Sequence, residues 1–355
     1  MITADPILVD AGKKLLSDLC TSEVINNSEN GTFASELWQT LEEMGMTLVS
    51  LPEAAGGSGA TLTDAFSLLH QAGYYAAPVP LAETFLASLV LHGAGIVIPA
   101  GPLTLIPVDN NNQLDLSTAS GKQTLTGKAV AVPWARHAKH LVVCLASSDG
   151  MSVTLIPQQA VSINEGVNMA GEPCDDIVIT DYPVASDYTQ TASLSADTLY
   201  AIGALTRAAM MAGATEKVLD QTVQYAGERV QFGRPIGKFQ AIQQELALLA
   251  GERAAAEVIV DRAVAELENG LSSTTAQSKI AAAKTRVGEA ADLATRVGHQ
   301  VHGAMGFTYE HSLHHCTRRL WSWREEYGIE TEWSVLLGKQ IIEQGRDQLW
   351  PWVCE

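Results

Sequence analysis

The chain has 355 residues, of which 46% are apolar and 17% charged, a composition typical of globular domains with a sizeable core. Forty acidic residues against 22 basic ones give a formal net charge of −18. Because such a surface repels polyanions, the composition argues against nucleic acid and anionic membranes as partners. The five scattered cysteines form no CxxC pair, and the start MITADPILVDAG lacks a signal-peptide pattern. We therefore expect reduced thiols and a cytoplasmic protein.

Three segments with different hydrophobic periods follow one another along the chain. Residues 1–98 have helical spacing, as in FASELWQTLEEMGM, and predict an N-terminal α-helical domain. Residues 99–190 consist of short β-branched runs separated by Asn, Ser, Asp and Gly, which predicts a middle antiparallel β domain. Residues 191–355 predict a C-terminal four-helix bundle, with helices at roughly 195–228, 239–268, 272–302 and 331–348. The fold class is therefore α+β with several domains.

The loop ERVQFGRPIGKFQAIQ, residues 228–243, is basic and aromatic within an acidic chain. Arg229 ends one long helical pattern and Gln240 opens the next. A guanidinium suits bidentate contact with a pyrophosphate, Phe232 can pack on a flat ring system, and the Gln240 amide can bond a ribose or phosphate. A dinucleotide ligand fits these residues. The alternative is an interhelical loop whose arginines pair with carboxylates of the same chain.

This loop resembles that of the acyl-CoA dehydrogenase family, whose members are flavoproteins with the same order of helical, β and helical domains. LWQTLEEMGMTLVSLPEAAGGSGATLTDAF with APVPLAET is similar to the family's N-terminal domain, and GHQVHGAMGFTYEHSLHHCTRRL to its C-terminal segment. The resemblance implies FAD as cofactor, acyl-CoA as substrate and an electron acceptor such as an electron-transfer flavoprotein. By position it implies ADP-side contacts to the FAD of a neighbouring subunit from five residues: Arg229, Phe232, Gln240, Gln300 and Gly303. Ala304 stands where the family often has a second glycine.

The family removes the substrate's α-proton with a Glu, and the resemblance implies two alternative positions for that base. One falls on Tyr327, where the order Glu326-Tyr327-Gly328 is inverted relative to the family's Tyr-Glu-Gly. The other falls on Gly203, which has no carboxylate. No catalytic residue is therefore in register, and Glu326 is the one candidate, with a solvated carboxylate as the alternative. The middle segment also lacks the family's Pro-Gly-x-Gly-Ser turn, and Trp134 is either a ring-covering residue or a core residue.

An intact cofactor loop beside two empty base positions is similar to one bacterial branch of the family, which acts on bulky acyl-CoAs of the steroid side-chain type. In that branch two unlike subunits form an α2β2 heterotetramer with half the usual number of flavins. The chain resembles the shorter subunit, so we expect a homologous catalytic partner, a role in lipid or steroid β-oxidation, and no activity of the isolated chain.

Three alternatives remain open. The first is a self-sufficient homotetrameric dehydrogenase that uses Glu326 as its base. The second is a structural relative that binds no flavin. The third is a metal-binding helical bundle, since the pairs His311 with His315 and Glu310 with His314 have the i, i+4 spacing of ligands on one helix face. No Glu-x-x-His occurs in the chain, so we expect no metal site.

Overall fold

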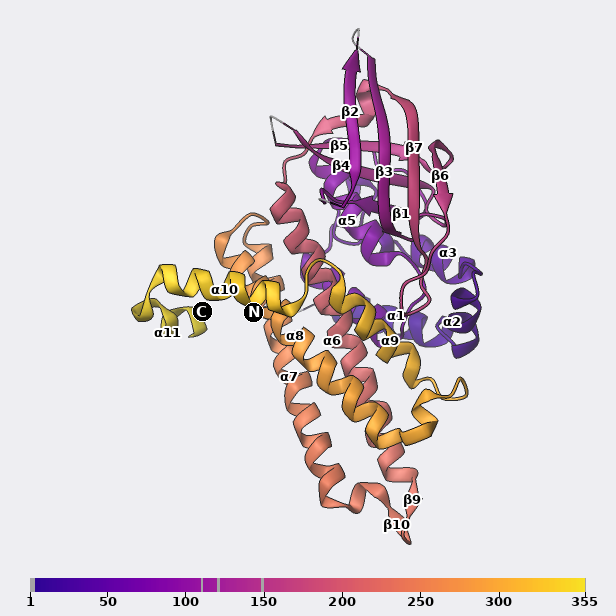
Figure 1. Cartoon of the computed structure of the whole chain (residues 1–355), viewed down its shortest axis with the longest axis vertical. Helices are drawn as coiled ribbons and strands as arrows, with labels where there is room; N and C mark the ends of the chain where they lie inside the picture. The colour runs from indigo at the N-terminus through magenta and orange to yellow at the C-terminus, as the bar shows by residue number, and fades with distance from the viewer. Residues whose placement is uncertain (1–3, 110, 120–121, 148–149, 355) are drawn as a thin grey trace. The chain divides into compact units, whose positions relative to one another are not determined.

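The computed structural model describes residues 4–109, 111–119, 122–147 and 150–354 (Figure 1). The chain divides into two compact units. One comprises residues up to 72 together with 76–202, and the other comprises 73–75 together with the chain from 203 onward. The division into three domains at 98 and 190 remains a prediction.

Five α-helices precede the strands of the first unit, the last two residues of the fourth helix belonging to the other unit. They are α1 (Pro6–Leu19), α2 (Ser22–Glu29), α3 (Ser35–Glu43), α4 (Leu62–Tyr74) and α5 (Leu81–Gly93). Asp5 and Thr21 cap α1 and α2, because the side chain of each accepts a hydrogen bond from a backbone N–H two or three residues later. Helix α5 is apolar around its whole circumference, and nearly all its side chains are buried.

Eight strands form two four-stranded sheets in the first unit. The sheet order β1-β4-β5-β8 comprises Leu103–Ile106, His140–Ser147, Gly150–Pro157 and Thr189–Thr191. The sheet order β2-β3-β7-β6 comprises Gln113–Ala119, Lys122–Pro133, Cys174–Val184 and Val161–Asn164. All pairs are antiparallel as expected except β1 with β4, which are parallel. This pair is possible because the long β2–β3 hairpin separates β1 from β4 in the chain and provides the crossover. A core of Ile, Leu, Val and Ala from both sheets fills the space between them.

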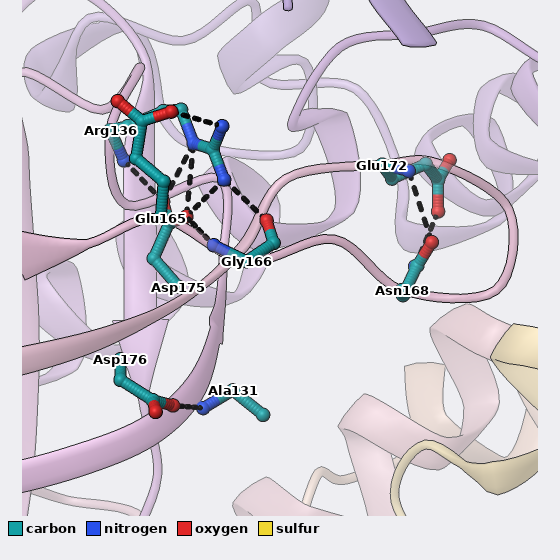
Figure 2. Close-up of polar contacts among 8 residues, drawn as sticks. All are labelled: Ala131, Arg136, Glu165, Gly166, Asn168, Glu172, Asp175 and Asp176. Atoms are coloured by element: carbon teal, nitrogen blue, oxygen red, sulfur yellow. Dashed lines mark hydrogen bonds and ion pairs between the residues drawn. The ribbon is translucent and has the colours of Figure 1, made fainter.

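A buried ion pair stabilises the turn after β3 and the loop before β7 (Figure 2). The backbone N–H of Arg136 donates to Asp175 Oδ2 at 2.9 Å, and the Arg136 guanidinium bonds the same carboxylate, the Glu165 carboxylate and the Gly166 carbonyl. The Asp175 side chain is 0% exposed. Trp134, which has a φ of 57°, is buried directly before this turn and is therefore a core residue.

The second unit is a helical bundle. It contains α6 (Ala196–Glu228), of which residues from 203 belong to this unit, then α7 (Gln240–Glu268) and α8 (Thr274–His302). Three shorter helices follow, α9 (Leu313–Glu325), α10 (Glu330–Gln344) and α11 (Arg346–Cys354). Helices α7 and α8 pack on each other, and many buried residues of α6 and α8 are alanine, which favours close packing. The pattern 313–325 was not among the four predicted helices, because its histidines and arginines interrupt the apolar period. No helix in the described ranges is long and apolar enough to span a membrane.

Candidate functional site

The loop 228–243 forms a short hairpin where α6 ends and α7 begins (Figure 1). Strands β9 (Val230–Gln231) and β10 (Arg234–Pro235) pair antiparallel. Phe232 and Gly233 make the turn, both with positive φ, at 52° and 80°. A positive φ is unfavourable for a residue with a Cβ atom, so the turn directs the Phe232 ring outward under strain. That ring is 93% exposed.

The cations of the hairpin are not engaged by carboxylates. Within the described part of the chain, neither Arg229 nor Arg234 forms an ion pair. The Arg234 guanidinium lies instead 4.3 Å from the centroid of the Phe239 ring, a cation–π contact. Arg229 is exposed, and so is Gln240 at the start of α7. The hairpin therefore presents positive charge and an aromatic face to solvent.

The segment after α8 lies at the same end of the bundle as the hairpin. The Tyr225 ring, one turn before Arg229, stacks on His302 with centroids 4.4 Å apart. Gly303 follows with φ 57° and ψ −137°, and a Cβ placed on it would meet no atom within 4 Å. Gln300 is exposed on the last turn of α8. The structure thus brings the two predicted segments to one end of the bundle, with an open glycine backbone that an anion can approach.

The two expected positions of the base meet in space. Gly203 lies in the buried stretch of α6, and the ring of Tyr327 lies against it. A Cβ on Gly203 would be 2.4 Å from Tyr327 Cε1, far inside ordinary contact distance. Neither position carries a carboxylate, and the ring occupies the space between them.

Glu326 is engaged by a buried arginine. Arg207 lies one turn after Gly203 on α6, and its Nε donates to Glu326 Oε2 at 2.5 Å. The Arg207 side chain is 3% exposed and that of Glu326 is 24% exposed. Glu326 therefore has a charged partner within this chain, through a charge-assisted hydrogen bond.

Lys284 of α8 binds the C-terminal end of α9, which precedes Glu326 in the chain. Its Nζ donates to the carbonyls of Trp323 at 3.1 Å and Arg324 at 2.9 Å, in the last turn of α9. Burial lowers the pKa of Lys284 to about 8. Arg207, Lys284 and Trp333, whose Nε1 donates to the Tyr327 carbonyl, were not identified from the sequence. The only signal was an arginine and a lysine inside otherwise small, apolar helical faces.

The histidine-rich segment does not form the ligand pairs that the metal-binding alternative requires. Helix α9 begins at Leu313, so His311 and Glu310 precede the helix and do not share a face with His315 and His314. The His311 Nδ1 accepts a hydrogen bond from the Leu313 N–H at 3.1 Å. In the described residues, no group of three or more His, Cys, Asp or Glu is placed to hold a metal ion.

A small pocket of about 150 Å³ lies beside these histidines. It is lined by His299, Phe307, Tyr309, His314, Thr317, Arg318 and Trp321. The His299 ring is stacked between Phe307 and Trp321. Burial lowers the pKa of His299, and it lowers the pKa of His302 to about 4 and that of His315 to about 3. These imidazoles are therefore neutral at physiological pH.

The chain combines two four-stranded sheets with a helical bundle that carries an exposed hairpin with two arginines, features of acyl-CoA dehydrogenase-like proteins. The sequence profile of the acyl-CoA dehydrogenase N-terminal domain matches residues 8–95, and that of the C-terminal domain matches residues 196–325. Acyl-CoA dehydrogenase IpdE2 of Mycobacterium tuberculosis is 30% identical over 299 residues, which cover 79% of each chain. The chain belongs to the acyl-CoA dehydrogenase family.

Solved structures that share this fold include the following two. The first is that of the ChsE4-ChsE5 complex from Mycobacterium tuberculosis, with a TM-score of 0.86 at 21% identity, covering 96% of this chain and 97% of the other. The second is that of a Tcur3481-Tcur3483 steroid ACAD variant, with a TM-score of 0.84 at 24% identity, covering 95% and 97%.

Proposed function

We propose that this chain is the non-catalytic subunit of a FAD-dependent acyl-CoA dehydrogenase that desaturates a bulky acyl-CoA between its α and β carbons. In the proposed complex, a homologous partner supplies the base and seats the flavin ring. This chain supplies contacts to the ADP half of FAD and a subunit interface, in a heterotetramer of two unlike chains. The single observation that carries the proposal is the exposed cation-bearing hairpin beside Gly303 in a chain whose two base positions hold Gly203 and Tyr327.

The residues at this end of the bundle fit a diphosphate. Arg229 is exposed and has no carboxylate partner in the described chain, so its guanidinium can donate two hydrogen bonds to phosphate oxygens. Gly303 leaves its neighbouring backbone open to an anion. Phe232 offers an exposed ring face for a nucleotide, and Gln240 and Gln300 offer amides for hydrogen bonds.

When bound, FAD supplies the hydride acceptor for the desaturation. The part of this chain is to hold the phosphates and to orient the cofactor toward the partner. Charge matters here, because a chain of net charge −18 repels a diphosphate unless cations gather locally. Glu326 is not assigned as the base, since its carboxylate is held by Arg207.

Relatives favour a steroid-type acyl-CoA and a partner of the same family. One solved structure of this fold is a complex of two differently named chains, ChsE4 and ChsE5, and another is described as a steroid ACAD. We infer from this likeness that the substrate here is a bulky acyl-CoA and that electrons leave to an acceptor such as an electron-transfer flavoprotein.

The test is flavin stoichiometry. The chain is purified alone and after co-expression with a family member encoded beside it, and flavin absorbance and native mass are measured. We expect a complex of both chains with one flavin per heterodimer, and desaturation of acyl-CoA only by that complex. An isolated chain that carries one FAD per copy and desaturates acyl-CoA by itself would refute the proposal and favour the self-sufficient homotetramer.

A further inference from the structure

The ring of Tyr327 lies directly against the backbone of Gly203. A Cβ on Gly203 would lie 2.4 Å from Cε1, 2.5 Å from Cδ1 and 2.7 Å from Cζ of the ring. Any side chain at 203 and the ring of Tyr327 therefore exclude each other. The glycine is needed here because the ring lies on the helix backbone itself.

Tyr327 has an unfavourable backbone conformation. Its φ is 54°, in the left-handed region that residues with a Cβ atom avoid, and Gly328 follows at 85°. Such a conformation persists only where the surroundings over-determine it, and it is typical of functional positions. A glycine at position 327 would adopt this conformation without strain, but the residue is a tyrosine.

Neighbouring helices clamp the segment on each side of the ring. The Trp333 Nε1 of α10 donates to the Tyr327 carbonyl at 2.8 Å, and Arg207 of α6 holds Glu326 at 2.5 Å. The Lys284 amine of α8 bonds the carbonyls at the end of α9, and the Arg324 guanidinium pairs with Glu330. These bonds fix the backbone from which the ring projects, so the segment cannot move away from Gly203 without breaking several of them.

We propose that Tyr327 is a specificity-determining residue that excludes acyl thioesters from this chain, so that acyl-CoA binds only beside the partner's base. The inference rests on the proposed function, in which a carboxylate at 203 or 327 would contact the α-carbon of the thioester. Tyr327 fills the space between both positions. Tyr327 thus replaces a carboxylate at one base position, and its ring fills the space beside the other, Gly203.

The experiment counts acyl-CoA bound to the complex with its partner, with butyryl-CoA as the calorimetric probe and free CoA as the ligand control. Tyr327→Gly removes the ring and suits the positive φ, and Tyr327→Asn removes it with a residue that tolerates this conformation. Tyr327→Phe is the matched control, because it keeps the ring. We expect the Gly and Asn variants to bind one more butyryl-CoA per copy of this chain than the wild-type and Phe complexes do.

The outcomes separate this inference from the proposed function. If the wild-type complex binds one butyryl-CoA per heterodimer and the Gly and Asn variants bind no more, the role of Tyr327 is refuted while the proposed function stands. If the wild-type complex already binds one per copy of each chain, both fail. An extra site in the Phe variant, or loss of the folded complex in both the Gly and Asn variants, would also overturn the inference, because Tyr327 would then be an ordinary core residue.

Discussion

Replacing Gly203 by alanine tests the packing at the two base positions directly. The new Cβ would lie 2.4 Å from Tyr327 Cε1, about 1 Å short of ordinary carbon contact, so the ring must retreat. The Tyr327 carbonyl accepts a hydrogen bond from Trp333, and the Tyr327 backbone has a strained, positive φ. If the backbone moves with the ring, it loses that hydrogen bond and changes this conformation. Overpacking of this kind costs about 1–3 kcal/mol, against a helix-propensity gain of about 0.5–1 kcal/mol. We expect a net loss of about 1–2 kcal/mol in the free energy of unfolding.

The matched control is Gly251→Ala on α7. Gly251 is exposed and a Cβ there would meet nothing within 4 Å, so only the propensity gain of about 0.5–1 kcal/mol remains. Urea unfolding followed by tryptophan fluorescence reports on this unit, which contains Trp321, Trp323, Trp333, Trp350 and Trp352. Tyr327→Ala combined with Gly203→Ala should remove the clash, giving a coupling energy above about 1 kcal/mol. Additive effects of the two substitutions would refute the packing argument.

Three further outcomes are expected. Arg229→Ala should weaken flavin retention by the complex about 10- to 100-fold, since charge-assisted hydrogen bonds contribute about 1.5–3 kcal/mol. Arg346→Ala, at an exposed site, is the control and should leave flavin retention unchanged. Flavin absorbance after dialysis measures the flavin retained. Asp175→Ala should lower the free energy of unfolding by about 3–5 kcal/mol in a denaturant titration, because Arg136 would lose its buried partner. Burial lowers the pKa of His302 to about 4 in the folded protein, against about 6.5 in the unfolded chain. The unfolded chain therefore binds a proton first as pH falls from about 6.5 to about 4, and the folded state loses stability over this range. His302→Phe should therefore flatten the decline of melting temperature between pH 7 and 5.

The sequence predicted the fold class and the placement of the cofactor loop because both follow from local patterns. Helical and alternating periods marked where helices give way to strands and return, and the segments quoted from the N- and C-terminal regions fall within the matched family domains. Arg229 was selected as a phosphate contact from its residue type together with the family resemblance, and Gly303 from the resemblance. The structure places both at one end of the bundle, although their roles remain predictions.

The contacts around the base positions could not be predicted from the sequence. Gly203 and Tyr327 are 124 positions apart in the numbering, and nothing local shows that a ring from one covers the backbone of the other. Counting positions treated Glu326 as shifted by one residue from the expected base. The structure adds Arg207, a buried cation that comes from a different helix and that gives Glu326 a structural partner. Tertiary pairing of this kind decides the chemistry of a carboxylate more than its register does.

The two ends of the candidate site differ in how completely this chain satisfies its own groups. At the hairpin, the chain holds Phe232 in a strained conformation and leaves its ring 93% exposed, with an edge-on contact to the Phe239 ring at 6.2 Å between centroids. At Tyr327 an equally strained residue is covered by a ring contact, a hydrogen bond from Trp333 and the Arg207–Glu326 ion pair. Strain that is not compensated inside a chain persists only where another molecule compensates it or function requires it. We therefore expect the proposed cofactor to bind at the hairpin, whereas the contacts around Tyr327 are made within this chain.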